Sequence, residues 1–460
     1  MTSLSRRSFL TGAGSVLAAP ALAQSSGETE TIIVGAGAAG IAAARRLAAA
    51  GRRFVLVEAA DRVGGRCVTD SKLFGVPFDL GARWIYSSDV NPVSKLARSG
   101  KLDIYPAPPG QRVRIGRRNA RESELEDFLS SLVRANRAIG DAGRGKVDMH
   151  CAQALPKDLG DWRPAVEFVL GPYNYGTDLN EISAMDMARA ADRDSNAFCR
   201  QGYGALLASL ANVPVQLSTP VLQIDTRPNT TEVRTAKGTL RGRFVIITVS
   251  TGVLSGGKIQ FTPELPKRQL DALARLKLGS FDHIALELTG NPLGLQRDDL
   301  VFEKAASAQT GALLANIGGS SIATVSVGGK FGRELAGKGD KDMVDFAIGW
   351  LTGLYGGDLR KAVKRTHATR WNTSPFVLGA VAAAGPGGQL ARRTMMEPIR
   401  DRLYFAGEAI HDTQFGTVGG AWESGDRAAE AILRKLGVLK PPVEPKPASQ
   451  PQPRRRRTRG

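Results

Sequence analysis

The chain has 460 residues, of which 42% are hydrophobic and 23% are charged, and its formal net charge is +18. This length is too great for one simple core, and the composition excludes a disordered or fibrous chain, so we expect a globular protein of two domains. The positive charge is diffuse over the body of the chain and indicates no specific nucleic-acid partner. The three cysteines and four histidines are widely spaced, so a disulfide framework and a metal site are not expected.

The first predicted element is an export signal with a short linker, residues 1–27. Arg6 and Arg7 precede a short apolar run, and residues 21–23 read Ala-Leu-Ala, a small-residue cleavage pattern. Paired arginines are typical of twin-arginine signals, so we expect a soluble protein exported to the periplasm by the twin-arginine machinery. An ordinary secretory signal is the alternative.

A dinucleotide-binding pattern follows at residues 31–58. The apolar stretch TIIV runs into Gly35, Gly37 and Gly40 and then into good helix formers, which predicts a strand, a tight turn and a helix in that order. These glycines let the chain turn, approach a pyrophosphate at the helix N-terminus and pack the helix close to the strand. A second apolar strand ends in Glu58, where a carboxylate would bond ribose hydroxyls.

A second glycine turn, DRVGGR, favours a flavin over a nicotinamide cofactor. Gly64 and Gly65 lie between Arg62 and Arg66, so two guanidinium groups can reach the same phosphates. Nicotinamide enzymes do not need this second turn.

From this turn onward the sequence resembles the flavin-containing amine oxidase family, which includes monoamine and polyamine oxidases, histone demethylases and L-amino-acid oxidases. The resemblance continues in FDLGARWIYSSDVNPVSKLA (78–97), RFVIITVSTGVL (243–254) and RLYFAGEAIHDTQFGTVGGAWESGDRAAEAIL (402–433). It implies FAD, bound non-covalently because no cysteine lies in 411–422. The cofactor-binding residues that it implies are Gly35, Gly37, Ala38, Ala39, Gly40, Glu58, Arg62, Gly64, Gly65, Arg66, Gly81, Ala82, Arg83, Trp84, Val221, Gly407, Glu408, Thr417 and Val418.

Between these stretches, the run ESELEDFLSSLVRANRAIG predicts an amphipathic helix with Leu125, Phe128, Leu129 and Leu132 on its apolar side. The stretches DHIALEL and SIATVSVGG predict strands of a mixed sheet that covers the flavin. All three segments are expected in a substrate domain.

Four residues are predicted at the reaction centre by the same resemblance. His283 stands where many members have a lysine that holds a water at flavin N5, and it either takes that role or is a core histidine. Trp371 matches the family, whereas Val381 and Thr417 occupy the places of two cage tyrosines, so we expect a wider pocket with less cation–π contact. Arg83 is interpreted either as a carboxylate clamp or as a surface or phosphate-side residue.

The implied activity is that of an FAD-dependent amine oxidase. It transfers a hydride equivalent from the carbon beside a small-molecule amine to flavin N5, and the imine then hydrolyses. The flavin is reoxidised by O2, which gives H2O2, or by a periplasmic electron acceptor. Two alternatives stay open: a same-fold flavoprotein acting on an apolar substrate, similar to carotene desaturases and protoporphyrinogen oxidases, and a catalytically silent FAD-binding protein that serves in binding or assembly. A homodimer is compatible with the sequence.

The expected fold class is α/β with mixed α+β character. The order of the motifs assembles a Rossmann-like FAD-binding domain from residues 28–95, 200–282 and 396–437. The substrate-binding domain, with a mixed β-sheet and helices, is expected from 96–199 and 283–395. Beyond these domains, the chain ends in a Pro-rich and Arg-rich tail, 438–460, that is predicted to be disordered.

Overall fold

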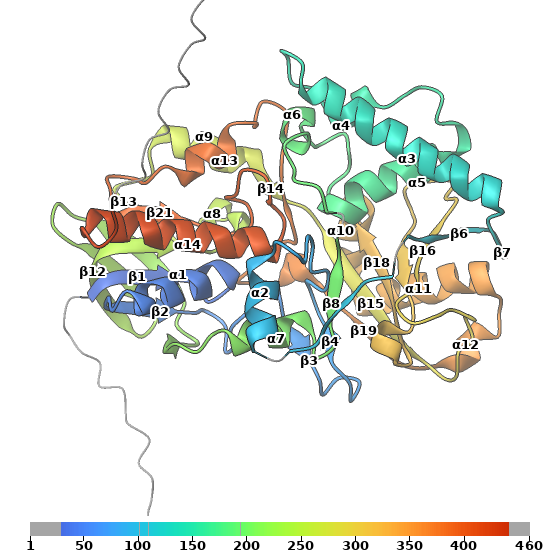
Figure 1. Cartoon of the computed structure of the whole chain (residues 1–460), viewed down its shortest axis with the longest axis horizontal. Coiled ribbons are helices and arrows are strands. Elements are labelled where there is room, and N and C mark those ends of the chain that lie inside the picture. Colours follow the sequence, from blue (N-terminus) through green and yellow to red (C-terminus); the bar gives the residue numbers. More distant parts are fainter. Residues whose placement is uncertain (1–28, 101, 109, 194, 441–460) are drawn as a thin grey trace, which may run out of the picture.

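The computed structural model describes residues 29–100, 102–108, 110–193 and 195–440. They form two lobes that lie side by side (Figure 1). The predicted export signal, 1–27, and residues 441–460 of the predicted tail, 438–460, lie outside the described residues, so both stay predictions. Among the described helices, none combines the length and apolar composition that crossing a membrane requires.

The first lobe is built on an eight-stranded sheet in the order β13-β10-β11-β12-β1-β2-β9, with β21 paired to β12. Strand β1 is parallel to β2 and β12, whereas β10, β11 and β12 form an antiparallel meander. The chain contributes these strands from three separated stretches. Their bounds are β1 (Thr29–Val34), β2 (Phe54–Val57), β9 (Val215–Gln216), β10 (Val221–Thr226), β11 (Thr231–Thr235), β12 (Gly238–Ile247), β13 (Gln260–Thr262) and β21 (Leu403–Phe405).

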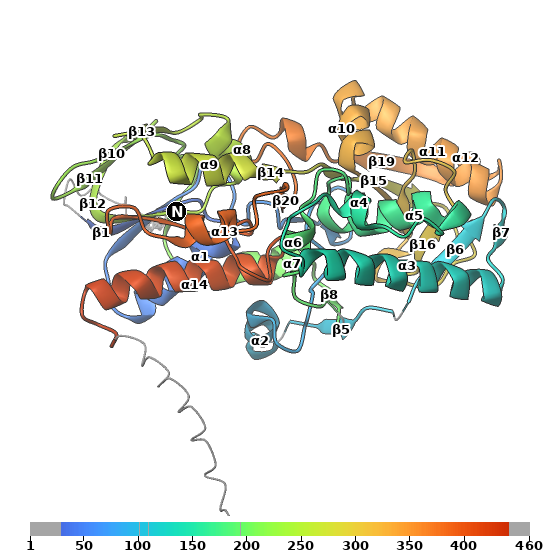
Figure 2. The ribbon, with the colours of Figure 1, turned by 90° about the horizontal axis from the view of Figure 1, so that it is seen from above.

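Helices cover both faces of this sheet because successive strand residues point to opposite sides. Ile33 and Ile246 pack with helices α1 (Ala38–Ala49) and α14 (Val418–Lys435), which lie side by side in Figures 1 and 2. Their neighbours Ile32 and Ile247 pack on the other face. The helices of that face are α8 (Thr251–Ser255), α9 (Lys267–Arg275) and α13 (Ala391–Met396).

The second lobe is built on a seven-stranded sheet in the order β19-β15-β18-β17-β16-β6-β7, in which only β6 and β16 are parallel. The predicted strands DHIALEL and SIATVSVGG are β15 and β18, which pair with each other inside this sheet. The bounds are β6 (Arg112–Ile115), β7 (Arg118–Asn119), β15 (Phe281–Leu288), β16 (Leu300–Glu303), β17 (Ala312–Leu314), β18 (Ile322–Gly328) and β19 (Val363–Ala368).

Helices also pack on both sides of the second sheet. One group is α10 (Gly329–Lys338), α11 (Asp340–Tyr355) and α12 (Leu359–Ala362), and the other includes α3 (Glu122–Gly143) and α5 (Arg163–Phe168). The expected mixed α/β fold is confirmed. Shorter elements complete it: β3 (Thr69–Asp70), β4 (Phe78–Asp79), β5 (Ile104–Pro106), β8 (Ala197–Cys199), β14 (Leu276–Leu278), β20 (Ala382–Ala384), α2 (Pro92–Ser99), α4 (Cys151–Ala154), α6 (Ala184–Met187) and α7 (Tyr203–Ser209).

Helix α3 corrects one detail of the sequence interpretation. It buries Phe128, Ser131, Ala135 and Ile139, whereas Leu129 is 40% exposed. A helix turns by about 100° per residue, so the residue after Phe128 points away from a stripe that runs through 128, 131, 135 and 139. Placing Leu129 on the buried side was therefore wrong.

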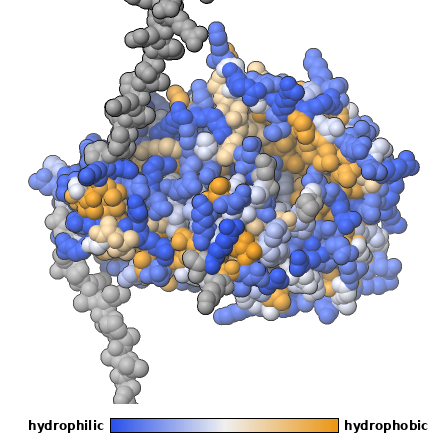
Figure 3. Space-filling view, viewed as in Figure 1, coloured by the Kyte–Doolittle hydropathy of each residue, from blue (hydrophilic) through white to orange (hydrophobic). Residues whose placement is uncertain are grey.

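Polar residues dominate the face seen in Figure 3, and apolar residues form separate small patches on it. On this face, the described part of the chain therefore exposes little apolar surface.

The contact between α1 and α14 depends on small residues. A Cβ atom built on Gly425 would lie 2.0 Å from the carbonyl oxygen of Ala39. Because this neighbour is backbone, it cannot move aside as a flexible side chain would. The close approach of the two helices therefore requires glycine at position 425.

We predict that Gly425→Ala lowers the free energy of unfolding by about 2 kcal/mol, because overpacking outweighs the gain in helix propensity. Gly349→Ala is the matched control. Gly349 lies inside α11, and a Cβ atom there meets no atom within 4 Å, so alanine should stabilise the protein by about 0.5–1 kcal/mol. Urea unfolding midpoints measure both effects. Equal shifts of the same sign in the two variants would contradict the packing argument.

Candidate active site

A cavity of about 470 Å³ is lined by residues from both lobes. All but one of the predicted site residues line it. They are Gly35, Gly37, Ala38, Ala39, Glu58, Arg62, Gly64, Gly65, Arg66, Gly81, Ala82, Arg83, Trp84, Val221, His283, Trp371, Val381, Gly407, Glu408, Thr417 and Val418.

Gly40 is the exception: it does not line the cavity but packs against Gly35, which does. A Cβ atom on Gly40 would lie 1.8 Å from the carbonyl oxygen of Gly35, so glycine is what lets α1 lie close to the end of β1. This is the close-packing role that the motif predicts for its third glycine.

One end of the cavity suits an anionic dinucleotide. The N-terminus of α1 has no side-chain cap, so its first amide groups stay available to a phosphate. Gly64 and Gly65 have φ values of +101° and +59°, a conformation that favours glycine. A Cβ atom on Gly65 would lie 3.5 Å from Cα of Gly37, so the two glycine turns touch. The turns and the helix end together form a cradle for a pyrophosphate.

Glu58 lies beside this cradle at the end of β2. Its Oε2 accepts a hydrogen bond from the amide of Ala36 at 2.7 Å, and its Oε1 accepts one from the amide of Ala60 at 2.9 Å. These bonds fix the carboxylate, and each oxygen keeps a lone pair for a ribose hydroxyl.

Arg66 lines the cavity and is paired within the fold. Its Nη1 lies 2.9 Å from Glu408 Oε1 and also bonds the carbonyl of Ala380, and its predicted contact with the phosphates stays a prediction. Glu408 in turn accepts a bond from the amide of Ala382 at 3.3 Å. Arg66 thus ties the second glycine turn to segments more than three hundred residues away, and its charge is neutralised there.

Arg83 is also paired. It is 9% exposed, and its Nη2 lies 3.1 Å from Asp298 Oδ1 while its Nη1 lies 3.8 Å from Asp79 Oδ2. A surface position for Arg83 was therefore wrong. Its guanidinium links the two lobes and is not free to clamp a substrate carboxylate.

His283 lies on β15 and faces the cavity with both ring nitrogens already bonded. Its Nε2 lies 3.2 Å from the carbonyl oxygen of Gly81 and must donate to it, so its Nδ1 accepts from Ser326 Oγ at 2.9 Å. Burial lowers the pKa of His283 to about 4, which keeps the ring neutral. In this geometry the imidazole holds the segment that begins at Gly81, and neither nitrogen is free to hold a water.

Trp371, Val381 and Thr417 form other parts of the wall. The indole of Trp371 donates to the carbonyl of Leu80 at 3.1 Å and packs on Gly81, whose Cβ would lie 3.0 Å from the ring. Thr417 caps α14, because its hydroxyl accepts from the amide of Gly420 at 2.9 Å. Its hydroxyl is therefore engaged in the fold, and its methyl group is what remains for the cavity.

Three aromatic residues that the sequence analysis missed line the same cavity as Trp371, Val381 and Thr417. They are Tyr86, Tyr173 and Phe281. Tyr173 packs edge-on against Phe281 at 5.9 Å between ring centroids. The expectation of a wider pocket with less cation–π contact was based on positions 381 and 417 alone, and it stays a prediction. Tyr86 could have been found, since it lies two residues after Trp84, but no motif marks position 173.

Arg193 is another lining residue that the sequence analysis missed. Its Nη2 donates to the carbonyl of Phe415 at 3.2 Å, and its guanidinium carbon lies 4.7 Å from the ring centroid of Tyr86. It lies in the connection between α6 and β8, which carries no recognisable motif.

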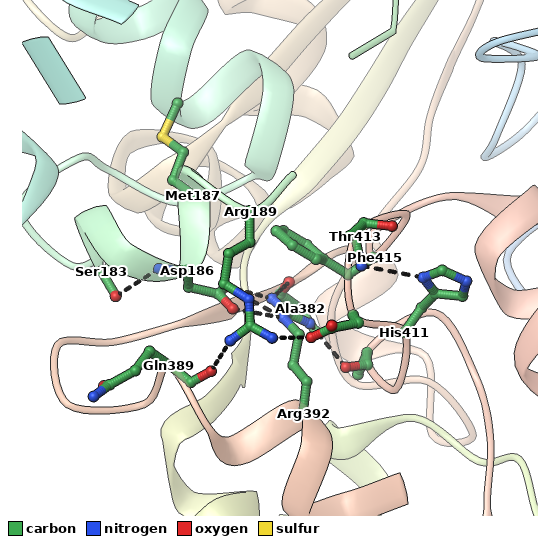
Figure 4. Close-up of polar contacts among 12 residues, drawn as sticks. Ser183, Asp186, Met187, Arg189, Ala382, Gln389, Arg392, His411, Thr413 and Phe415 are labelled. Carbon is green, nitrogen blue, oxygen red and sulfur yellow. Dashed lines mark hydrogen bonds and ion pairs between the residues drawn. The ribbon is translucent and has the colours of Figure 1, made fainter. Parts of the chain in front are cut away.

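Arg392 braces the cavity wall from outside. It is 1% exposed and bonds both carboxylate oxygens of Asp186 at 2.8–3.2 Å. It also donates to the carbonyls of Ala409 and Ala382 at 2.8 and 3.1 Å, and it lies 3.7 Å from the ring centroid of Phe415 (Figure 4). Each of these last three residues adjoins a residue of the lining, so one buried guanidinium fixes three stretches of wall.

We predict that Gly37→Val gives a folded protein without flavin. A Cβ atom on Gly37 meets no protein atom within 4 Å, and its φ of −76° suits valine, but the side chain would fill the phosphate cradle. The free energy of unfolding should stay within about 1 kcal/mol of the cofactor-free wild type. Absorbance near the flavin bands and urea unfolding measure the two properties. Gly40→Val is the contrasting variant and should fail to fold. If Gly37→Val retained flavin at the wild-type level, the phosphate cradle would not lie at Gly37.

We also predict that His283 makes the free energy of unfolding fall at acidic pH. The unfolded histidine takes up a proton near its usual pKa of about 6.5, whereas the folded ring does so only near 4. Stability from this group is therefore present above pH 6.5 and is lost as the pH falls toward 4, by about 3 kcal/mol. Burial raises the pKa of the adjacent Asp282 to about 6, which opposes the loss. The measurement is therefore the difference between wild type and His283→Gln at each pH; a difference independent of pH would contradict the assignment.

The comparisons with known proteins agree with this geometry. The family model described as flavin containing amine oxidoreductase matches residues 38–433. Polyamine oxidase 5 of Oryza sativa subsp. japonica is 28% identical over 455 residues, with 90% of each chain covered. Lysine-specific histone demethylase 2 of Homo sapiens is 27% identical over 87% of this chain, which spans 53% of the demethylase.

Solved structures show the same fold. Cyclohexylamine oxidase from Brevibacterium oxydans matches with a TM-score of 0.75 at 21% identity, over 89% of this chain and 100% of that one. Wild-type putrescine oxidase bound to putrescine matches with a TM-score of 0.74 at 18% identity, over 88% of this chain and 99% of that one. Because the family model covers most of the residues and the cavity fits the cofactor, the chain belongs to the flavin-containing amine oxidoreductases, and its cofactor is FAD.

Proposed function

We propose that this chain oxidises an amine at the carbon beside the nitrogen and releases an imine that water hydrolyses. The observation that carries the proposal is a single cavity that joins the phosphate cradle to a chamber lined by aromatic and apolar side chains. When bound, FAD supplies the acceptor for the two electrons of the amine. The relatives' names, polyamine oxidase and cyclohexylamine oxidase, support the same class of reaction.

The side chains around the chamber exclude water and orient the substrate. Trp371, Val381 and the methyl group of Thr417 give the amine no charged partner, so the chamber favours the neutral form of the amine over the ammonium. Holding the amine with its α-carbon against the electron acceptor speeds the reaction, because the reacting groups are already oriented.

No lining group of the described residues is arranged as a strong base. The carboxylate of Glu408 is paired with Arg66, that of Glu58 accepts backbone amides, and the ring of His283 is neutral with both nitrogens bonded. The proton of the ammonium is therefore lost before the substrate binds in its reactive form.

Non-covalent attachment of FAD is part of the proposal. Cys67 lines the cavity, but burial raises the pKa of its thiol well above the usual range, so it is a poor nucleophile. The oxidant, O2 or a periplasmic carrier, and export by the twin-arginine machinery are further proposals. The export proposal depends on the sequence around Arg6 and Arg7 alone.

The test is anaerobic mixing of the purified yellow protein with a panel of amines. We expect flavin bleaching whose rate rises with pH as the ammonium loses its proton, and detectable aldehyde or ketone product after hydrolysis. The Gly37→Val protein, prepared in the same way, is the blank. Bleaching by polyene or porphyrinogen compounds alone would replace amine oxidation with the desaturase-like alternative. Bleaching by dithionite alone would indicate a catalytically silent flavoprotein.

A further inference from the structure

Arg193 reaches the substrate end of the cavity. A Cβ atom built on Gly416 would lie 2.8 Å from Val381 Cγ1 and 3.6 Å from Arg193 Nη2, so these two side chains meet at the same point of the wall. Gly416 also adjoins Thr417. The guanidinium of Arg193 is therefore beside both residues that stand in the places of the family's cage tyrosines.

The position of Arg193 is fixed by neutral groups. Its guanidinium carbon lies 4.7 Å from the ring centroid of Tyr86 and 5.3 Å from that of Tyr175, and its Nη2 donates to the carbonyl of Phe415. Two aromatic faces and one carbonyl orient the cation, but none of them cancels its charge. The ring of Tyr86 is thereby already covered by a cation, so it has less to offer a substrate ammonium.

The other charged residues of the cavity lining are either paired or belong to the lobe that carries the phosphate cradle. In that lobe, Arg62 donates to the carbonyl of Gly65 at 3.0 Å, and Lys258 lies between α8 and β13. Arg66 pairs with Glu408, and Arg83 pairs with Asp298. Glu58 lies at the phosphate cradle. Within the described part of the chain, no carboxylate forms an ion pair with Arg193, so no described acidic group neutralises this guanidinium.

We propose that Arg193 selects amines that carry a carboxylate and rejects amines that carry a second ammonium group. The proposal rests on the proposed amine oxidation and names its substrate class, amino carboxylates. A guanidinium offers a fork of donors that matches the two oxygens of a carboxylate, and a cavity shielded from water strengthens this attraction. The same charge repels the distal ammonium of a diamine. This preference differs from the polyamine and putrescine named for two of the relatives.

Four substrates on one five-carbon chain isolate the effect of charge. Pentylamine is neutral beyond its amine. Norleucine adds a carboxylate to the carbon that carries the amine, 6-aminohexanoate adds one to the far end, and cadaverine adds an ammonium to the far end. In wild type, we expect kcat/KM for at least one of the two carboxylates to exceed that for cadaverine by 10-fold or more. Arg193→Met should reduce this ratio at least 10-fold while changing pentylamine turnover less than 3-fold. Arg193→Lys, which keeps the charge but not the fork, should lie between them.

Arg360→Met is the control for net charge, because Arg360 is exposed and lies outside the cavity lining. It should leave the selectivity ratio unchanged. A wild-type preference for cadaverine over both carboxylates, or an Arg193→Met protein with the wild-type ratio, would overturn the proposal.

A binding measurement separates this proposal from the proposed function. Pentanoate has no amine and cannot be oxidised in this reaction, so its titration against the flavin absorption spectrum reports binding alone. We expect Arg193→Met to raise the Kd for pentanoate at least 10-fold, with Arg360→Met as wild type. If no amine bleaches the wild-type flavin, the proposed amine oxidation is wrong. The titration still tests the role of Arg193, because an unchanged Kd for pentanoate in Arg193→Met would overturn that role. If Arg193→Met does not retain FAD, the Kd of Arg193→Lys takes its place, with at least a 3-fold rise expected and an unchanged value overturning the proposal.

Discussion

The walls of this cavity depend on the pairing of buried and partly buried arginines with carboxylates. A guanidinium removed from water needs a charged partner and acceptors for its remaining donors, and breaking a buried pair by removing one partner costs about 3–5 kcal/mol. Three arginine–carboxylate pairs join segments that are distant in the sequence; those of Arg83 and Arg392 are buried, and that of Arg66 is partly buried. They are Arg66 with Glu408, Arg83 with Asp298, and Arg392 with Asp186. Together they hold the second glycine turn, the lobe junction and the stretch before α14 in place around one cavity.

This pairing divides the charged residues into those that build the fold and those available to ligands. The paired arginines are occupied, and the free amides at the start of α1 remain for the phosphates. At the opposite end Arg193 is held only by aromatic rings and a carbonyl. The cavity thus has an anion-binding end for the cofactor and a second positive group for the substrate, with apolar and aromatic side chains between them. Such a division suits a reaction that needs exclusion of water and orientation more than it needs a base.

Local patterns in the sequence were sufficient for the parts of the structure that depend on local chemistry. The glycine turns, the strand that ends at Glu58 and the helix that begins after Thr417 follow from backbone conformation and hydrophobic periodicity, which a short window contains. The mixed fold followed from the order of such windows, and FAD followed from the family resemblance that they carry. Nearly all site residues that were predicted from these windows line one cavity.

The roles of individual side chains were harder to predict because their partners are far away in the chain. Arg66 is separated from Glu408 by 342 positions and Arg83 from Asp298 by 215, so nothing near either arginine indicates that its charge is taken. The ring of His283 is likewise bonded to Gly81, 202 positions away. Tyr173 and Arg193 lie in connections without a motif, where only the assembled tertiary structure shows that they face the cavity.

The most direct test of this account is a crystal structure of the purified yellow protein soaked anaerobically with a non-oxidisable amino carboxylate analogue. The account predicts FAD with its pyrophosphate between the turns at Gly37 and Gly65, and the carboxylate of the analogue against Arg193. Density for FAD outside this cavity, or an analogue bound with its carboxylate turned away from Arg193, would contradict it.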